Sequence, residues 1–94
     1  MIEFRAVVTD IRLESRVGVQ ATWWMALDAT RFRPGDRGVL AAETRSGTRL
    51  EIAVTDVVKD ADDVIWHVVE KPLAAGTDVR GRIDAPASAA LRTP

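Results

Sequence analysis

The sequence predicts an all-β protein that folds as a single small six-stranded antiparallel β-barrel, built from two similar three-stranded halves related by a pseudo-twofold axis. Apolar and polar residues alternate with period two through most of the 94 residues, which is typical of strands with one buried face. Short motifs of the first half recur in the second half. Turn residues separate the apolar runs, and within these runs the apolar residues do not recur at the spacing of a helix.

The recurring motifs come in the same order in both halves, as expected after duplication of one β-unit. Each half has Val-Thr-Asp followed by a β-branched residue, then a tryptophan, then a turn that contains glycine. The matched segments are 8–11 with 54–57, Trp24 with Trp66, and 32–36 with 73–77. Closure of the two units into a barrel would remove the strand edges that otherwise invite aggregation.

The first strand of each half is expected to bend at its Val-Thr-Asp motif. Apolar residues occupy the even positions of 2–8, but after this motif the apolar phase shifts to odd positions from Ile11. In the second half the phase that runs from Leu50 to Val54 is broken at Val57. Such a phase shift within a strand predicts a β-bulge or a sharp bend.

The second strand, expected from about residue 18 to residue 28, contains two adjacent tryptophans. Neighbouring residues of a strand point to opposite faces. Trp23 belongs to the apolar face, so we expect Trp24 on the outer face together with Gln20 and Thr22. A large aromatic side chain on an outer face indicates an interface, or else a loop or the C-terminal tail that covers it.

The matching strand of the second half, at 64–70, leaves two interpretations open. Its hydrophobicity places Trp66 inside, with Val64 and Val68. Alignment with the first half instead turns Trp66 outward like Trp24 and places His67 inside.

The third strands, expected at 38–43 and 77–84, each follow a turn that contains glycine. The Phe-x-Pro-Gly-Asp and Leu-x-x-Gly-Thr turns at 32–36 and 73–77, with this layout of short strands, resemble the small six-stranded barrels beside the GTPase domain of translation factors. They are also similar to OB-type barrels. The resemblance implies a fold and no activity or site, because small barrels host many unrelated functions.

Residues 1–85 are predicted to form the barrel domain, and 86–94 a short irregular C-terminal tail that is too short for a stable helix on its own. Thirteen basic and 14 acidic residues give a net charge of −1, without the basic excess typical of proteins that bind nucleic acid or anionic membranes. The absence of cysteine excludes disulfides and thiolate chemistry. We expect a cytoplasmic protein without cofactor, metal site or membrane segment.

The favoured function is a non-enzymatic binding or self-assembly module, whose partner is a second copy or another protein. Trp24 and its neighbours Gln20 and Thr22 are the expected contact, because aromatic residues are enriched at interfaces. The first alternative is a small OB-like nucleic-acid-binding barrel. It would use Trp24 for stacking and the arginines around the first glycine turn for phosphate, namely Arg31, Arg33 and Arg37.

The second alternative is an enzyme that uses Asp10 and Asp56, which a twofold axis would bring to equivalent positions. Two close carboxylates share a proton and can act as acid and base. We favour a simpler role, in which each aspartate accepts backbone N–H groups at its own bend. The single histidine, His67, is expected to be a packed residue, because no second histidine is present to complete a metal or catalytic site.

Overall fold

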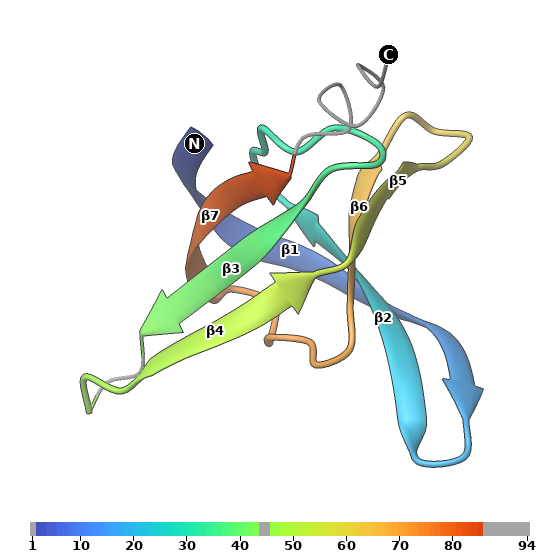
Figure 1. Ribbon diagram of the computed structural model, residues 1–94, viewed down its shortest axis with the longest axis horizontal. Coiled ribbons are helices and arrows are strands. Elements are labelled where there is room, and N and C mark those ends of the chain that lie inside the picture. Colours follow the sequence, from blue (N-terminus) through green and yellow to red (C-terminus); the bar gives the residue numbers. More distant parts are fainter. Residues whose placement is uncertain (1, 44–45, 86–94) are drawn as a thin grey trace.

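The computed structural model describes residues 2–43 and 46–85, and this part of the chain is all β (Figure 1). Its strands form one antiparallel sheet with the order β4-β3-β7-β1-β2-β6-β5. Their bounds are β1 Ile2–Val17, β2 Gln20–Leu27, β3 Arg37–Glu43, β4 Arg49–Val54, β5 Asp56–Lys59, β6 Ile65–Val69 and β7 Asp78–Ala85. The all-β prediction is confirmed. The tail expected at 86–94 lies outside the described residues.

The sheet has seven strands instead of six because the expected fourth strand is interrupted at Thr55. Before this residue β4 pairs with β3, and after it β5 pairs with β6. The Thr55 N–H already bonds to the carbonyl of Val68 in β6, so the chain changes its partner strand here. The predicted bend is confirmed. A closed barrel is not, since β4 and β5 form the two edges of the sheet and no ladder joins them.

Strand β1 changes partner in the same manner without being interrupted. Its Ile2–Val7 part pairs with β7, and from Val8 to Val17 it pairs with β2. The register shifts between Val8 and Asp10, where the sequence predicts a bulge. This prediction is confirmed.

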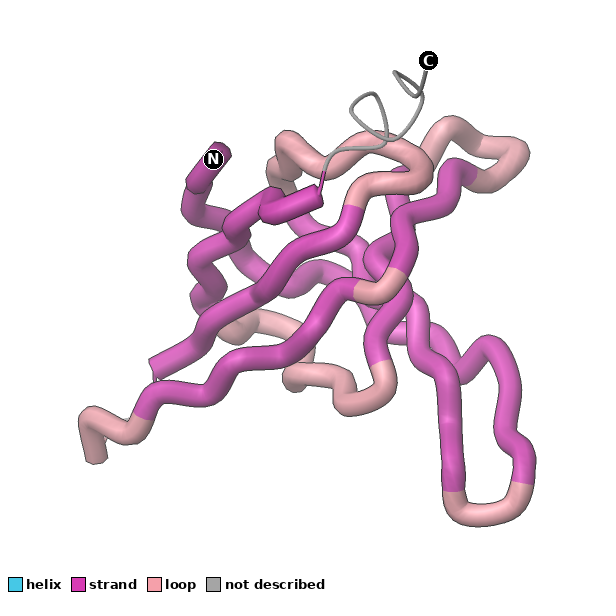
Figure 2. The backbone as a smooth tube through the Cα atoms, in the orientation of Figure 1, coloured by secondary structure: helices cyan, strands magenta, loops and turns pink. Residues whose placement is uncertain are grey.

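The sheet curls over on itself (Figure 2), and its distant strands share one core. Met25 of β2 and Leu40 of β3 belong to the same buried cluster, although β1 and β7 lie between their strands in the sheet. Both halves of the chain contribute to this cluster. Its members are Ala6, Val8, Met25, Phe32, Leu40, Ala42, Val54, Val57, Val69, Val79 and Ile83.

The two predicted glycine turns have the same geometry. In one, the Asp36 N–H bonds to the Arg33 carbonyl at 2.9 Å, and Gly35 has a φ of 90°. In the other, the Thr77 N–H bonds to the Ala74 carbonyl at 3.1 Å, and the glycine between them also has a φ of 90°. A glycine with positive φ at the third position is the requirement of a type II turn.

The first hairpin differs from the prediction at its tip. Val19, expected in the second strand, lies in the turn and is 99% exposed, and β2 begins at Gln20. Strand β1 runs on to Val17, and every residue from 12 to 20 is exposed. Residues 13–22 therefore form a two-stranded projection, called here the β1–β2 ribbon, which extends away from the other strands (Figures 1 and 2).

Candidate interaction surface

An aromatic pair lies on the outer face of β2 and β6. The rings of Trp24 and Trp66 are 6.0 Å apart between centroids and inclined by 37°. Trp66 points outward, as the alignment of the two halves predicts, while His67 and Val69 are fully buried in the core. Trp66 itself is only 3% exposed because its neighbours on this outer face cover it, whereas Trp24 is half-buried.

Two charged residues hold Trp66 in place. The Arg12 guanidinium lies over the Trp66 ring, 4.8 Å from its centroid, in a cation–π contact. The Asp60 carboxylate accepts a hydrogen bond of 2.8 Å from the Trp66 indole N–H. This hydrogen bond is the main cause that lowers the pKa of Asp60, so that the carboxylate stays ionised.

Strand register and loop chemistry put these residues together. Arg12 lies directly opposite Trp24 in the β1–β2 ladder, so both side chains project from the same face. Asp60 begins the hairpin loop after β5, where its carboxylate also accepts the N–H groups of Asp62 and Val64 at 2.8 and 3.0 Å. This is the local bonding by which aspartate forms turns. No sequence motif indicates that Arg12 or Asp60 contacts Trp66.

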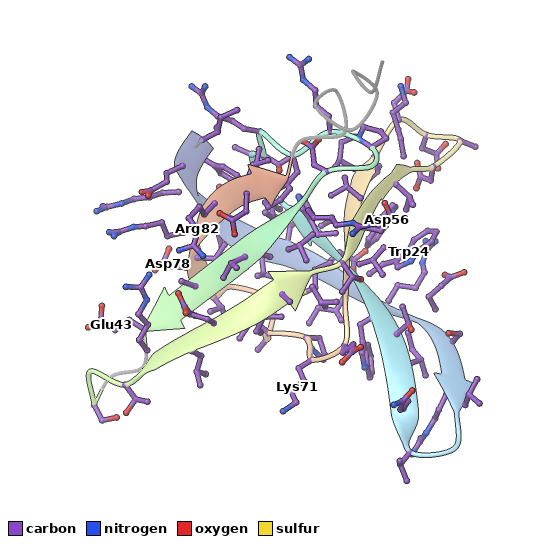
Figure 3. The ribbon with its side chains drawn as sticks, viewed as in Figure 1. Trp24, Glu43, Asp56, Lys71, Asp78 and Arg82 are labelled. Atoms are coloured by element: carbon purple, nitrogen blue, oxygen red, sulfur yellow. The ribbon has the colours of Figure 1, made fainter. Side chains whose placement is uncertain are left out.

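The three residues predicted for the contact share one face of β2. Gln20 is exposed, and Thr22 and Trp24 are half-buried, with Trp24 nearest to the body of the molecule. In Figure 3, Trp24 lies on the right of the molecule. The β1–β2 ribbon therefore presents a continuous surface that begins at the aromatic pair and continues to the exposed tip.

The ribbon also has open backbone edges. Strand β7 pairs with β1 only as far as Val7, and β6 pairs with β2 only at residues 23–25. In the described chain, the ribbon strands thus pair only with each other. Apolar side chains are exposed along it, with Leu13 46%, Val17 79% and Val19 99% exposed. Open edges with apolar side chains are typical of surfaces that pair with another chain.

The other two predicted contact residues, Arg31 and Arg33, lie apart from this surface, in the loop between β2 and β3. Both are exposed, and they flank Phe32, which is buried against the ring of Phe4 at 5.7 Å and the ring of His67 at 5.2 Å. Within the residues described, no cation–π contact joins Arg31 or Arg33 to Trp24 or Trp66. The cation at the aromatic pair is Arg12 instead.

His67 is a packed residue with both ring nitrogens bonded. Nδ1 lies 2.8 Å from the Met25 carbonyl, so it must carry the proton and donate. Nε2 therefore accepts from the Thr30 hydroxyl, also at 2.8 Å, and that hydroxyl in turn accepts the Phe32 N–H at 3.1 Å. Desolvation lowers the pKa of His67, which favours this neutral form.

Asp10 and Asp56 do not form a carboxylate pair. Each accepts the N–H of the following residue, Ile11 or Val57, at 2.8 Å, which is the local role favoured from the sequence. Asp10 lies on β1 and Asp56 on β5, with β2 and β6 between them. Three strand spacings correspond to roughly 14 Å along the sheet, and no hydrogen bond joins the two carboxylates in the part of the chain that the structure describes.

A second surface feature is a charged groove of about 500 Å³ over β1, β7 and β3. Its walls include Arg5 and Arg80, which lie directly opposite each other in the β1–β7 ladder. Neither guanidinium has a carboxylate within ion-pair distance in the part of the chain that the structure describes. Glu43 and Asp78 also line the groove, on the side of the molecule away from Trp24 (Figure 3).

Within residues 2–43 and 46–85, no three acidic, histidine or cysteine side chains gather where they could hold a metal ion. The same residues contain no helix that is long and apolar enough to cross a membrane. Models of known protein families were compared with the chain and none matches, and neither a curated protein nor a solved structure matches it.

Proposed function

We propose that this protein is a non-enzymatic assembly module that binds a second copy of itself through the β1–β2 ribbon and the adjoining Trp24. The observation behind the proposal is the ribbon, a projection that is exposed from residue 12 to residue 20 and open along its edges. An isolated two-stranded hairpin is only marginally stable in water. A further strand laid against it would bury its apolar side chains and satisfy its backbone groups.

Trp24 supports the proposal from the base of the ribbon. Its ring is fixed by contact with Trp66, so little conformational entropy would be lost on binding. Tryptophan at the centre of an interface is among the residues whose truncation weakens association most. A half-buried and pre-positioned Trp24 next to open strand edges fits such a role.

The test is the oligomeric state in solution, measured by light scattering over a range of concentrations. We expect the wild-type chain to self-associate and Trp24→Ala to weaken the association by roughly tenfold or more. Because Trp24→Ala also removes a packing contact, Thr22→Lys provides a second variant that places a charge on the same face. Ala53→Lys adds the same charge to an exposed position of β4 and is the matched control.

A wild-type chain that stays monomeric at every concentration would overturn the proposal. Equal association of wild type, Trp24→Ala and Thr22→Lys would overturn the assignment to this face. Far-UV circular dichroism on each variant separates a lost contact from a lost fold.

We also propose that the curled sheet is a barrel built from two similar halves. Its two edge strands, β4 and β5, are connected by the chain through Thr55 and not by a ladder of hydrogen bonds. Strand β1 in the first half and β4 with β5 in the second take equivalent places. Each pairs first with the third strand of the other half, β7 or β3, and then with the second strand of its own half, β2 or β6. The registers agree as well. Asp10 pairs with Ala26 and Asp56 with Val68, the positions that the motif alignment equates.

Binding of single-stranded nucleic acid is the second candidate function, through the charged groove. Two arginines directly opposite each other repel, and a bound phosphate would relieve this repulsion. The two acidic residues in the groove, Glu43 and Asp78, weaken its attraction for a polyanion. For this reason we favour the assembly module.

A mobility-shift experiment with a single-stranded oligonucleotide at low salt tests this second candidate. Binding that is lost in Arg5→Ala/Arg80→Ala, but retained in Arg31→Ala/Arg33→Ala, would assign it to the groove. The reverse result would assign it to the loop arginines expected from the sequence. No shift at low salt for the wild-type chain would exclude both sites.

A further inference from the structure

We infer that the second copy pairs with the open edge of β1, antiparallel and centred on Ser15, so that two sheets join into one. This inference rests on the proposed self-association and specifies which edge and which register it uses. The occupant is a second copy of this chain because the edge is complementary to itself in charge.

The open edge of β1 begins where β7 ends. Strand β7 pairs with Ile2–Val7, and the turn before it still bonds to Val8, through the Gly76 N–H and the Thr77 carbonyl. Beyond this point, on the side away from β2, the backbone of β1 has no ladder partner among the described residues. An edge of this kind is a template for strand addition.

The other edges of the sheet are less accessible. At β5, the carbonyl of Val57 already accepts the Gly35 N–H at 2.9 Å. Strand β4 faces Glu70 and Lys71 across a small cavity of about 190 Å³. The open edge of β2 is only Gln20–Thr22, because β6 occupies the residues that follow. The edge of β1 is thus the longest one that a second strand can approach.

The charges on β1 then select the register. Glu14 and Arg16 flank Ser15, and all three are exposed. The β1–β2 register shifts between Leu13 and Ser15, so Glu14 has no partner residue in β2. In an antiparallel pair centred on Ser15, Glu14 of each copy lies on the side of Arg16 of the other, which gives two attractive pairs of opposite charge. Charged side chains protect a strand edge against pairing when they repel those of a copy. One charge of each sign, placed symmetrically about a serine, attracts a copy instead.

Cross-linking tests the register directly, since the chain contains no cysteine. Opposed residues of antiparallel strands have Cα atoms about 4.5 to 5.5 Å apart, which suits a disulfide. We expect Ser15→Cys to form a disulfide-linked dimer under mild oxidation at least tenfold faster than Val19→Cys. Val19 is the matched control because it is more exposed but lies at the ribbon tip, away from the axis.

Charge reversal provides an independent arm. Glu14→Arg and Arg16→Glu each leave two like charges around Ser15, and we expect each to weaken self-association roughly tenfold or more. The double variant Glu14→Arg/Arg16→Glu restores opposite charges and should associate like wild type. An equal mixture of the two single variants should form a mixed dimer, because their edges are complementary.

The results separate this inference from the proposed function. If wild type associates and Trp24→Ala weakens it, while Val19→Cys cross-links as fast as Ser15→Cys, the edge assignment is wrong and the proposed function stands. If single charge reversals leave the association unchanged, the register is wrong. A wild-type chain that is monomeric throughout would overturn both.

Discussion

The neutral His67 ring, with a hydrogen bond at each of its nitrogens, connects the loop between β2 and β3 to the core. Its two hydrogen bonds reach Met25 on one side and Thr30 on the other. Protonation would put a second donor at Nε2 and a charge in the apolar core. The Thr30 hydroxyl could then accept from the ring only by reorienting.

We therefore expect stability to fall as the pH drops below the value at which the unfolded histidine titrates, about 6.5. The sign follows from burial, because the folded pKa is lowered and the unfolded chain binds the proton more readily. Urea unfolding at pH 7.5 and pH 5.5 measures the effect. His67→Gln is the control, since it cannot titrate and should lose less stability between these two values. Equal losses in the two proteins would contradict this explanation.

Single residues also explain where sequence reasoning succeeded and where it stopped. The alignment of the two halves placed His67 inside and Trp66 outside, which is correct, whereas hydrophobicity suggested the reverse. Hydrophobicity was misleading because both faces of β6 are covered, the outer one by Trp24 and Arg12. Arg12 could not be found from the sequence, since its place opposite Trp24 depends on a register shift between Leu13 and Ser15.

At the scale of elements, the junction of β3 with β7 depends on a close backbone approach at Gly38. A Cβ atom at this position would lie 1.9 Å from the Arg82 carbonyl oxygen. The register of the β3–β7 ladder shifts between Arg37 and Gly38, so this close approach lies at a β-bulge. At Gly81, by comparison, a Cβ would meet the Phe4 ring at 2.4 Å, and a side chain can move more easily than backbone.

We expect Gly38→Ala to destabilise the protein by more than about 2 kcal/mol, because the two strands must separate to admit the methyl group. Gly81→Ala makes the same chemical change against a side chain and should cost less. Urea unfolding of both variants at pH 7.5 measures the difference. A larger loss for Gly81→Ala than for Gly38→Ala would contradict this view of the junction.

The elements themselves were predicted with different success. The bends after Val8 and Val54 could be predicted because the apolar residues change from one side of the strand to the other at these points. The length of β1 was not found. From residue 12 to residue 17 both of its faces are exposed, so no alternation marks the strand as far as Val17.

In the whole molecule, the two halves of the chain are interleaved. Strand β3 of the first half pairs only with β4 and β7, and β7 of the second half pairs only with β3 and β1. Neither half can complete its ladders alone. The resulting core also includes residues from both halves.

Unfolding should therefore occur in one cooperative transition. The described tryptophans all lie on β2 and β6, so their fluorescence follows one side of the sheet, whereas far-UV circular dichroism follows all of it. We expect the two signals to coincide in urea at a fixed, low protein concentration. A fluorescence transition that precedes the other would mean that the side of the sheet with β2 and β6 unfolds separately from the rest.

The single strand β1 connects the core to the ribbon, and this has a mechanical consequence. Its 16 residues first pair with β7 in the body of the molecule and then form one side of the ribbon. A force applied to the ribbon tip along β1 would load the β1–β7 hydrogen bonds in shear, all together. If a second copy binds the ribbon as proposed, force on that copy would be transmitted along one continuous backbone into the sheet, without passing through a loop.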